Sequence, residues 1–277
     1  MKGVIRNRPI VYSIILAMLT SILWGASAPL VRIMSAKCQD WVTPLLLIAV
    51  NVMFFAIAAI LLGKVNGIDG FRHIFKIEGI TKGILAIMPV AIFFAFTLIA
   101  NIDSISGASV ENPAVFSLMI LVELVSSLVQ NTIFRGLLTI ALLIKHSTTK
   151  SERVKSIFKA PAMYLFIIYI PANIINTGSL NFMQLVNTFI VGAGLCAAYL
   201  YSKNLMSLVL IQGIWQALGY AINALGLGSD NQLLAPPAAI AYIVILILIV
   251  VFSVIFARRA EPFVLDGEMR AANKDNP

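Results

Sequence analysis

The sequence predicts an all-α, polytopic membrane protein with eight transmembrane helices and both termini in the cytoplasm. Hydrophobic residues make up 60% of the 277 residues and charged residues only 12%, and the mean hydropathy is +0.95. Soluble domains carry about 25% charged residues. Two further observations support the same fold class: the number of long apolar segments, and the alternation of positive charge between the loops that join them.

Eight segments are long enough to cross a bilayer core of about 30 Å, which takes about 20 apolar residues. In chain order they are 10–35, 42–63, 83–101, 112–143, 160–177, 181–202, 205–226 and 237–257. The fourth is long enough to tilt strongly or to continue beyond the membrane surface. Prolines stand at several helix starts, where a missing N–H costs little: Pro44, Pro113, Pro161 and Pro236.

Positive charge alternates from loop to loop. Lysine and arginine accumulate in cytoplasmic loops, and here every second loop is basic. One side carries Lys2, Arg6, Arg8; Lys64, Arg72, Lys76, Lys82; Lys145, Lys150, Arg153, Lys155, Lys159; Lys203; and Arg258, Arg259, Arg270, Lys274. The loops of the other side contain only Lys37 among cations. An odd number of helices would disrupt this alternation.

The net charge of +8 is therefore explained mainly by the lysine and arginine residues of the cytoplasmic loops. The basic residues are spread over five loops and tails without interleaved aromatic residues, so the expected partner is the lipid bilayer and not nucleic acid. We expect one transmembrane domain over 1–258 and a short, disordered cytoplasmic tail over 259–277. Cys38 and Cys196 should lie at different depths, which argues against a disulfide between them.

Polar groups inside the segments are few. Placing an ionisable side chain at the bilayer centre costs at least about 2.5 to 3.5 kcal/mol, so such a residue is a functional hypothesis by default. Glu123 is the only carboxylate well inside a segment, and Arg135 is the only cationic residue well inside one. The uncharged amides are Asn51, Gln130, Asn131, Asn173, Gln184, Asn187, Gln212, Gln216 and Asn223. Each amide could also simply bond neighbouring helices, at about 0.6 to 2 kcal/mol per contact.

The spacing of these residues predicts polar helix faces. Residues four apart share a face of an α-helix, which applies to Gln212 with Gln216 and to Asn131 with Arg135. Glu123 and Gln130 are seven apart, two turns along one face. With Asn131 neutral, Arg135 has two expected roles: it extends to the cytosolic interface, or it caps the helix end near the loop after residue 144.

Three motifs carry a family resemblance. They are Gln130-Asn131-Thr132-Ile133-Phe134-Arg135-Gly136, Tyr169-Ile170-Pro171-Ala172-Asn173 and Gln212-Gly213-Ile214-Trp215-Gln216. In order and spacing they resemble the motifs E-E-x-x-F-R-G, F-x-x-x-H and H-x-x-x-N/D of the CPBP family of intramembrane metalloproteases, the CAAX protease and bacteriocin-processing (Abi) group. The resemblance covers about 112–226.

The resemblance implies a zinc site at positions where this chain has only amides. A catalytic zinc needs about three His, Cys or carboxylate ligands, whereas the matching residues are Gln130, Asn131, Asn173, Gln212 and Gln216. An amide takes up no proton as a general base near neutral pH. His73 and His146 fall in predicted cytoplasmic loops, and Glu123 alone makes no metal cage. We therefore expect no catalytic residues, no metal and no cofactor, with zinc only if the protein is active after all.

Three functions follow as hypotheses. The first is a catalytically inactive CPBP homologue (a pseudoenzyme) that acts as a membrane scaffold, regulator or bacteriocin-immunity factor and binds a membrane protein or a transmembrane or lipidated peptide. An alternative is an active CPBP intramembrane metalloendopeptidase with a rearranged site. A third is a small-solute transporter, because Trp24-Gly25 resembles the opening of drug/metabolite transporters. The expected location is the cell membrane, crossed several times, in particular a bacterial cytoplasmic membrane.

Overall fold

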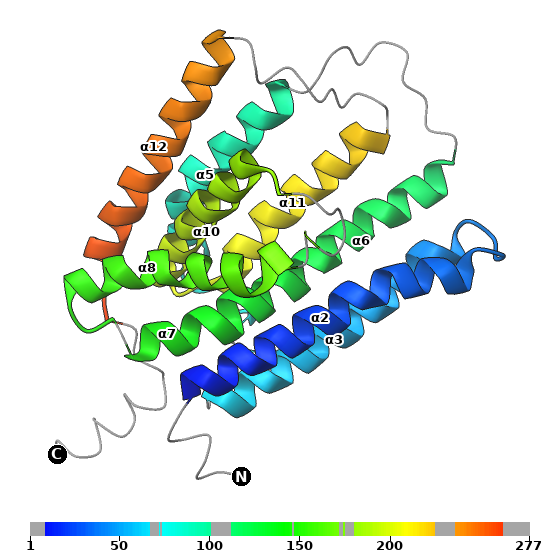
Figure 1. Cartoon of the computed structure of the whole chain (residues 1–277), viewed down its shortest axis with the longest axis horizontal. Helices are drawn as coiled ribbons and strands as arrows, with labels where there is room; N and C mark the ends of the chain where they lie inside the picture. The colour runs from blue at the N-terminus through cyan, green and yellow to red at the C-terminus, as the bar shows by residue number, and fades with distance from the viewer. Residues whose placement is uncertain are drawn as a thin grey trace.

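The fold is a bundle of long helices (Figure 1). The structure is a computed structural model, and it describes residues 9–66, 72, 74–100, 112–145, 147–171, 174, 180–224 and 236–262, among which there is no strand. Asn173, His73, His146 and most of the predicted tail lie outside the described residues. The helices are α2 (Pro9–Ser35), α3 (Val42–Asn66), α5 (Ile80–Ala100), α6 (Pro113–Asn131), η1 (Thr132–Thr139), α7 (Ile140–Lys145), α8 (Lys150–Tyr164), η2 (Leu165–Tyr169), α10 (Phe182–Ser202), α11 (Leu205–Ala224) and α12 (Pro236–Arg259).

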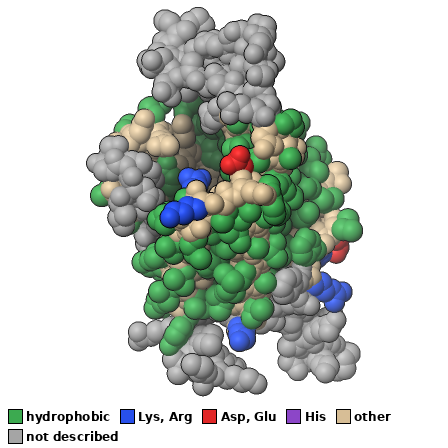
Figure 2. All heavy atoms as spheres, turned by 90° about the vertical axis from the view of Figure 1, so that its right-hand side faces the viewer, with side chains coloured by type: hydrophobic (Ala, Val, Ile, Leu, Met, Phe, Trp, Pro, Cys, Tyr) green, Lys and Arg blue, Asp and Glu red, His purple; other side chains and the backbone are tan. Residues whose placement is uncertain are grey.

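The protein is a multi-pass membrane protein. Seven stretches of the described helices are long and apolar enough to cross a bilayer: 11–35, 42–64, 80–97, 113–139, 182–202, 205–222 and 239–259. Large hydrophobic side chains stand exposed on the outside of the bundle, among them Ile33 at 74% and Ile240 at 65%. Figure 2 shows one face covered mainly by hydrophobic side chains. Such a surface matches a lipid environment, where exposed apolar groups carry no penalty.

The predicted fifth segment, 160–177, is not among these stretches. Its described part belongs to two shorter helices, the end of α8 and the π-helix η2, while residues 172, 173 and 175–177 lie outside the described residues. The expected loop 145–159 is also different, because α8 begins at Lys150. Thr149 and Glu152 form a capping box at that helix start, a local signal that nucleates a helix even in a charged stretch.

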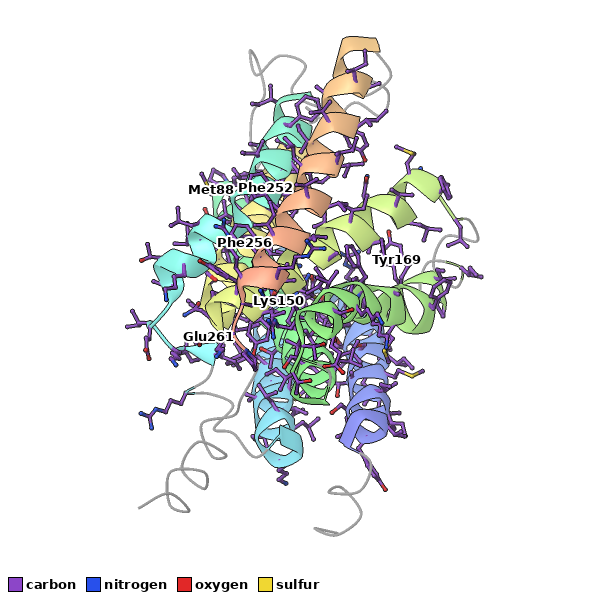
Figure 3. All side chains as sticks on the ribbon, turned by 90° about the vertical axis from the view of Figure 1, so that its left-hand side faces the viewer. Met88, Lys150, Tyr169, Phe252, Phe256 and Glu261 are labelled. Atoms are coloured by element: carbon purple, nitrogen blue, oxygen red, sulfur yellow. The ribbon has the colours of Figure 1, made fainter. Side chains whose placement is uncertain are left out.

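Arg153 fixes α8 against the end of α12. Sequence reasoning placed Arg153 in a solvated loop, but its side chain is buried. It donates from Nη1 to the carbonyls of Ser147 and Thr148, at 2.9 and 3.1 Å, and from Nε to the carbonyl of Ala257 at 3.2 Å. Figure 3 shows Lys150 at the start of α8 and Tyr169 at the far end of the α8–η2 rod. One end of this rod is thus anchored by an arginine that satisfies three backbone carbonyls.

Helix α10 forms the centre of one half of the bundle, where it packs against α5, α8 and α12. Its residues 193–200 are all buried. Small residues permit this packing: a Cβ on Gly194 would lie 2.6 Å from Cγ2 of Val90 and 2.9 Å from Cγ2 of Ile249. Close approach through small residues is how membrane helices gain packing energy without a hydrophobic driving force. In the other half, α6 packs against both α3 and α11.

Four of the predicted basic loops lie together at one end of the bundle. Asn204 donates from Nδ2 to the carbonyls of Lys76 and Glu78, at 2.5 and 3.0 Å. Lys203 pairs with Glu261 at 3.5 Å, and Arg153 contacts Ala257. The start of α2 and the end of α12 point to the same end of the bundle (Figure 1). The charge alternation along the sequence therefore corresponds to a physical end of the fold.

A glycine substitution tests the packing of α10. We expect Gly194→Ala to lower the free energy of unfolding by about 1 to 3 kcal/mol, because the new methyl group overpacks the contact with Val90 and Ile249. Gly25→Ala is the matched control, since a Cβ there has nothing within 4 Å. Unfolding in mixed micelles with increasing SDS measures both. Equal stability of the two variants would contradict this packing.

Candidate functional site

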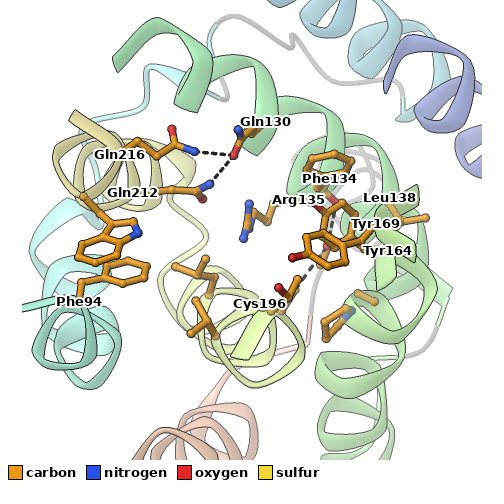
Figure 4. Close-up of a pocket in the computed structure, with 18 of the residues that line it drawn as sticks. Phe94, Gln130, Phe134, Arg135, Leu138, Tyr164, Tyr169, Cys196, Gln212 and Gln216 are labelled. Atoms are coloured by element: carbon orange, nitrogen blue, oxygen red, sulfur yellow. Dashed lines mark hydrogen bonds between the residues drawn. The ribbon is translucent and has the colours of Figure 1, made fainter. Parts of the chain in front are cut away.

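Four amide side chains form one hydrogen-bond network between α6 and α11. Gln212 and Gln216 each donate from Nε2 to Oε1 of Gln130, at 2.6 and 2.8 Å, as Figure 4 shows. Asn131 donates from Nδ2 to Oε1 of Gln212 at 3.2 Å. The structure therefore brings together four of the residues that the sequence motifs singled out, although 81 to 86 residues separate them along the chain.

A single backbone carbonyl sets the direction of the whole network. Asn131 Nδ2 also donates to the carbonyl of Ser127 at 2.9 Å, and a carbonyl can only accept. The nitrogen of Asn131 must face this carbonyl, so Gln212 presents its oxygen to Asn131 and its nitrogen to Gln130. Gln130 then offers its oxygen, and Gln216 offers its nitrogen. The orientations of all four amides follow from this one contact.

Two small residues let α6 and α11 approach closely enough for these bonds. Gly213 lies beside Gln212, and a Cβ on it would be 3.2 Å from Cδ2 of Leu124 and 3.4 Å from Cβ of Ser127. Ser127 is fully buried and donates from Oγ to the carbonyl of Val209 at 2.9 Å. A larger residue at either position would hold the helices apart and stretch the amide contacts.

Arg135 lies in a π-helix that begins directly after Asn131. Asn131 ends α6, and residues 132–139 form η1, where hydrogen bonds run from i to i+5. Thr139 follows this spacing and donates from Oγ1 to the carbonyl of Phe134 at 3.1 Å. Asn131 reaches Gln212 on α11, and Arg135 lines the cavity that Gln212 and Gln216 also line. The shared helix face expected for Asn131 and Arg135 stays a prediction, but Arg135 lies in η1 and not in an α-helix.

Arg135 points into a cavity at the centre of the bundle (Figure 4). It extends neither to the loop after residue 144 nor to a helix end. The cavity has a volume of about 490 Å³ and also exposes Gln130, Gln212 and Gln216. Cys196 and Tyr164 are the ionisable side chains that interact electrostatically with Arg135, and both are neutral at pH 7 in their usual state. No carboxylate of the described residues forms an ion pair with it.

Glu123 lies apart from this cavity. It is partly buried, it does not line the cavity, and its electrostatic neighbour is Arg32 on α2. Within the described part of the chain, no three His, Cys, Asp or Glu side chains come close enough to hold a metal ion together. Cys38 and Cys196 are both free thiols, as expected.

Aromatic residues that sequence reasoning missed form two walls of the cavity. Phe94 on α5 stacks on Trp215 with ring centroids 4.6 Å apart and an interplanar angle of 7°. Phe134 lies against Tyr164 with centroids 4.3 Å apart. The position of Trp215 between Gln212 and Gln216 was a usable signal, because neighbours of cavity-lining helix residues often reach the same space. The pairing with Phe94 depends on tertiary packing alone.

Comparison with known proteins adds no relative: no protein-family model, no curated protein and no solved structure matches the chain. The fold and the site themselves define the class. The chain is an all-helical, multi-pass membrane protein whose central cavity combines a hydrogen-bonded amide network with one arginine.

Removing the shared acceptor tests the network. We expect Gln130→Leu to lower the free energy of unfolding by about 1 to 2 kcal/mol, because two partly buried amide nitrogens then lose their acceptor. Gln130→Glu keeps an acceptor oxygen, and its carboxylate shares the cavity with the Arg135 cation, so it should lose less stability than Gln130→Leu. The same micellar unfolding assay compares them. A leucine variant as stable as the wild type would show that these hydrogen bonds are not formed.

Proposed function

We propose that this protein is a non-proteolytic homologue of the CPBP intramembrane metalloproteases that acts as a membrane scaffold, regulator or bacteriocin-immunity factor. In this role it binds a membrane protein or peptide. The observation that carries the proposal is the amide network itself. Gln130, Asn131 and Gln212 stand where the family motifs have acidic residues and histidine, and here they bind one another.

The chemistry of the network supports a binding role. Hydrolysis needs a group that accepts a proton from water, or a metal that lowers its pKa. A neutral amide does neither, but it donates and accepts hydrogen bonds at once. Replacing charged groups by amides keeps a polar centre in the membrane without the cost of buried charge. Such a centre suits recognition of another polar group better than bond cleavage.

The proposal includes a finer topology, with eight transmembrane helices and both termini in the cytoplasm of a bacterium. In it, the predicted segment 160–177 supplies the eighth crossing. Two observations support this arrangement: the start of α2 and the end of α12 point to one end of the bundle, and Lys76, Lys203 and the first turn of α8 with Arg153 lie at that end. Basic loops face the cytoplasm.

A small-solute transporter stays the less favoured alternative. Trp24, which suggested it, donates from Nε1 to Oδ1 of Asn51 at 2.7 Å. The tryptophan therefore has a structural role, the joining of α2 to α3. Uptake of a solute into proteoliposomes that depends on the amide-lined cavity would revive this hypothesis.

Metal analysis tests the loss of catalysis. We expect the purified wild type to carry no stoichiometric zinc and to cleave no transmembrane peptide. The variant Gln130→Glu, Asn131→Glu, Asn173→His, Gln212→His restores the family residues and should bind about one zinc ion per chain, with circular dichroism as a check of its fold. Zinc bound by the wild type and lost in Glu123→Ala would overturn the proposal in favour of an active enzyme.

Photo-crosslinking in native membranes tests the partner. Gln184 is exposed at the edge of the cavity, and Val244 is exposed on α12, away from it. A photoreactive residue at Gln184 should give a discrete crosslinked membrane protein or peptide, whereas one at Val244 should give lipid adducts only. The same products at both positions, or none at Gln184, would contradict a partner at this site.

A further inference from the structure

We propose that the cavity beside Arg135 binds an amphiphilic monoanion: a molecule with one carboxylate or phosphate group, a hydrogen-bond donor next to that group, and an apolar body. This ligand goes beyond the proposed function, because its binding requires neither the loss of catalysis nor a protein partner. Three properties of the cavity lead to it, and each specifies one part of the ligand.

The charge of Arg135 specifies the anion. The guanidinium lies inside a membrane-spanning stretch, four residues before its end at Thr139, where an uncompensated charge costs several kcal/mol. The described residues that line the cavity include no aspartate and no glutamate. Glu123 on α6 does not line the cavity, and its electrostatic neighbour is Arg32. Among the described residues Arg135 has no counterion, and the cavity of about 490 Å³ has room for a ligand. A ligand with one negative charge would pair with this guanidinium.

Gln216 specifies the donor. Its nitrogen is used by Gln130, at 2.8 Å, and its oxygen is buried with no hydrogen-bond partner among the described atoms. The carbonyl of Ser127 sets this orientation through Asn131, Gln212 and Gln130. A flip of the Gln216 amide would bring its oxygen against the oxygen of Gln130, where neither atom can donate. A buried acceptor without a donor costs about 1 to 3 kcal/mol. This oxygen has almost no exposed surface in the structure, so the Gln216 side chain must turn toward the cavity before a ligand N–H or O–H reaches it and recovers that cost.

The aromatic walls specify the apolar body. The Phe94–Trp215 stack lies on one side of the cavity, and Phe134 with Tyr164 lies on the other. Leu138 and Val191 add aliphatic surface. Pockets of about 300 to 1,000 Å³ with mainly apolar walls and a few directed polar groups are typical of small-molecule sites. The edge of the cavity reaches Gln184, which is exposed at the start of α10, so a long apolar tail can leave the cavity there.

Two sources can supply this chemistry, an anionic membrane lipid or a small soluble acid with an apolar group. In phosphatidylglycerol, the phosphate and the glycerol hydroxyls provide the charge and the donor. In an N-acyl amino acid, the carboxylate and the amide N–H do so. The test uses probes that vary one property at a time and then separates the two sources.

The first experiment measures dissociation constants of the detergent-purified full chain for three probes with the same oleoyl tail. N-oleoylglycine has both the anion and the donor, oleate lacks the amide donor, and oleoylethanolamide lacks the charge. We expect N-oleoylglycine to bind at least about tenfold more tightly than either of the others, since each missing contact removes one buried polar interaction. Equal affinity for all three probes would overturn the proposal.

The second experiment compares variants. Arg135→Gln should weaken binding of N-oleoylglycine by about tenfold or more, while Arg32→Gln, which removes an arginine outside the cavity, should leave it unchanged. Gln216→Leu gives a separate readout: N-oleoylglycine and oleate should then bind equally, because the acceptor for the amide N–H is gone. Gel filtration and thermal unfolding identify variants that fail to fold. Full binding by a folded Arg135→Gln variant, or a preserved preference in Gln216→Leu, would overturn the site.

The third experiment identifies the source by native mass spectrometry in phosphatidylglycerol or phosphatidylcholine nanodiscs. Retention of phosphatidylglycerol that depends on Arg135 assigns the site to a membrane lipid. Binding of N-oleoylglycine without such retention assigns it to a small acid. Both results support an anion site. Equal retention of phosphatidylcholine and phosphatidylglycerol, together with no binding of N-oleoylglycine, would show that the cavity does not select anions.

Discussion

The hydrogen bond from Asn131 to the carbonyl of Ser127 determines how the polar centre of this protein is arranged. It fixes which atom each of four amides presents to the next, because a backbone carbonyl can only accept. The contact lies within α6, between residues four apart, and the close packing of α6 against α11, which Gly213 and Ser127 permit, brings the glutamines of α11 to it. The orientation of the amides and the unused oxygen of Gln216 are therefore two consequences of one local contact. In lipid no water replaces a lost hydrogen-bond partner. Breaking this contact is therefore costly, and the neighbouring amides keep the orientation that it sets.

The centre contains two kinds of polarity with different requirements. The amides satisfy one another and need nothing further for most of their donors and acceptors. Arg135 has no such partner in the described structure, and its neighbours Cys196 and Tyr164 carry no opposing charge in their usual state. The two groups therefore have different roles. The amide network holds α6 against α11 and so maintains the shape of the cavity, and Arg135 selects an anionic ligand. Hydrolysis would instead require ionisable groups or metal ligands at the positions that the amides occupy.

The sequence was sufficient for most of the fold. Apolar length alone located α10 and α11 within about two residues at either end, since a bilayer imposes both composition and length on a spanning helix. It was insufficient for α8, because a charged stretch such as KSERVKSIFK has the composition of a loop, and only the Thr149–Glu152 capping box reveals the helix. Four of the motif amides, Gln130, Asn131, Gln212 and Gln216, lie together, while Asn173 is outside the described residues. The position of Arg135 in a cavity could not be predicted, because that cavity forms only where helices far apart in the sequence pack together.

The π-helix η1 also affects how relatives of this protein should be sought. A π-turn contains one residue more than an α-turn, so a chain that lacks one residue of 137–139 keeps every side chain of the motif but sets α7 at a different rotation about the helix axis. In this part of the fold, structure is then encoded by the number of residues as well as by their identity. Alignments that score only substitutions would group proteins with different rotations of α7, and a one-residue gap at this point would separate them.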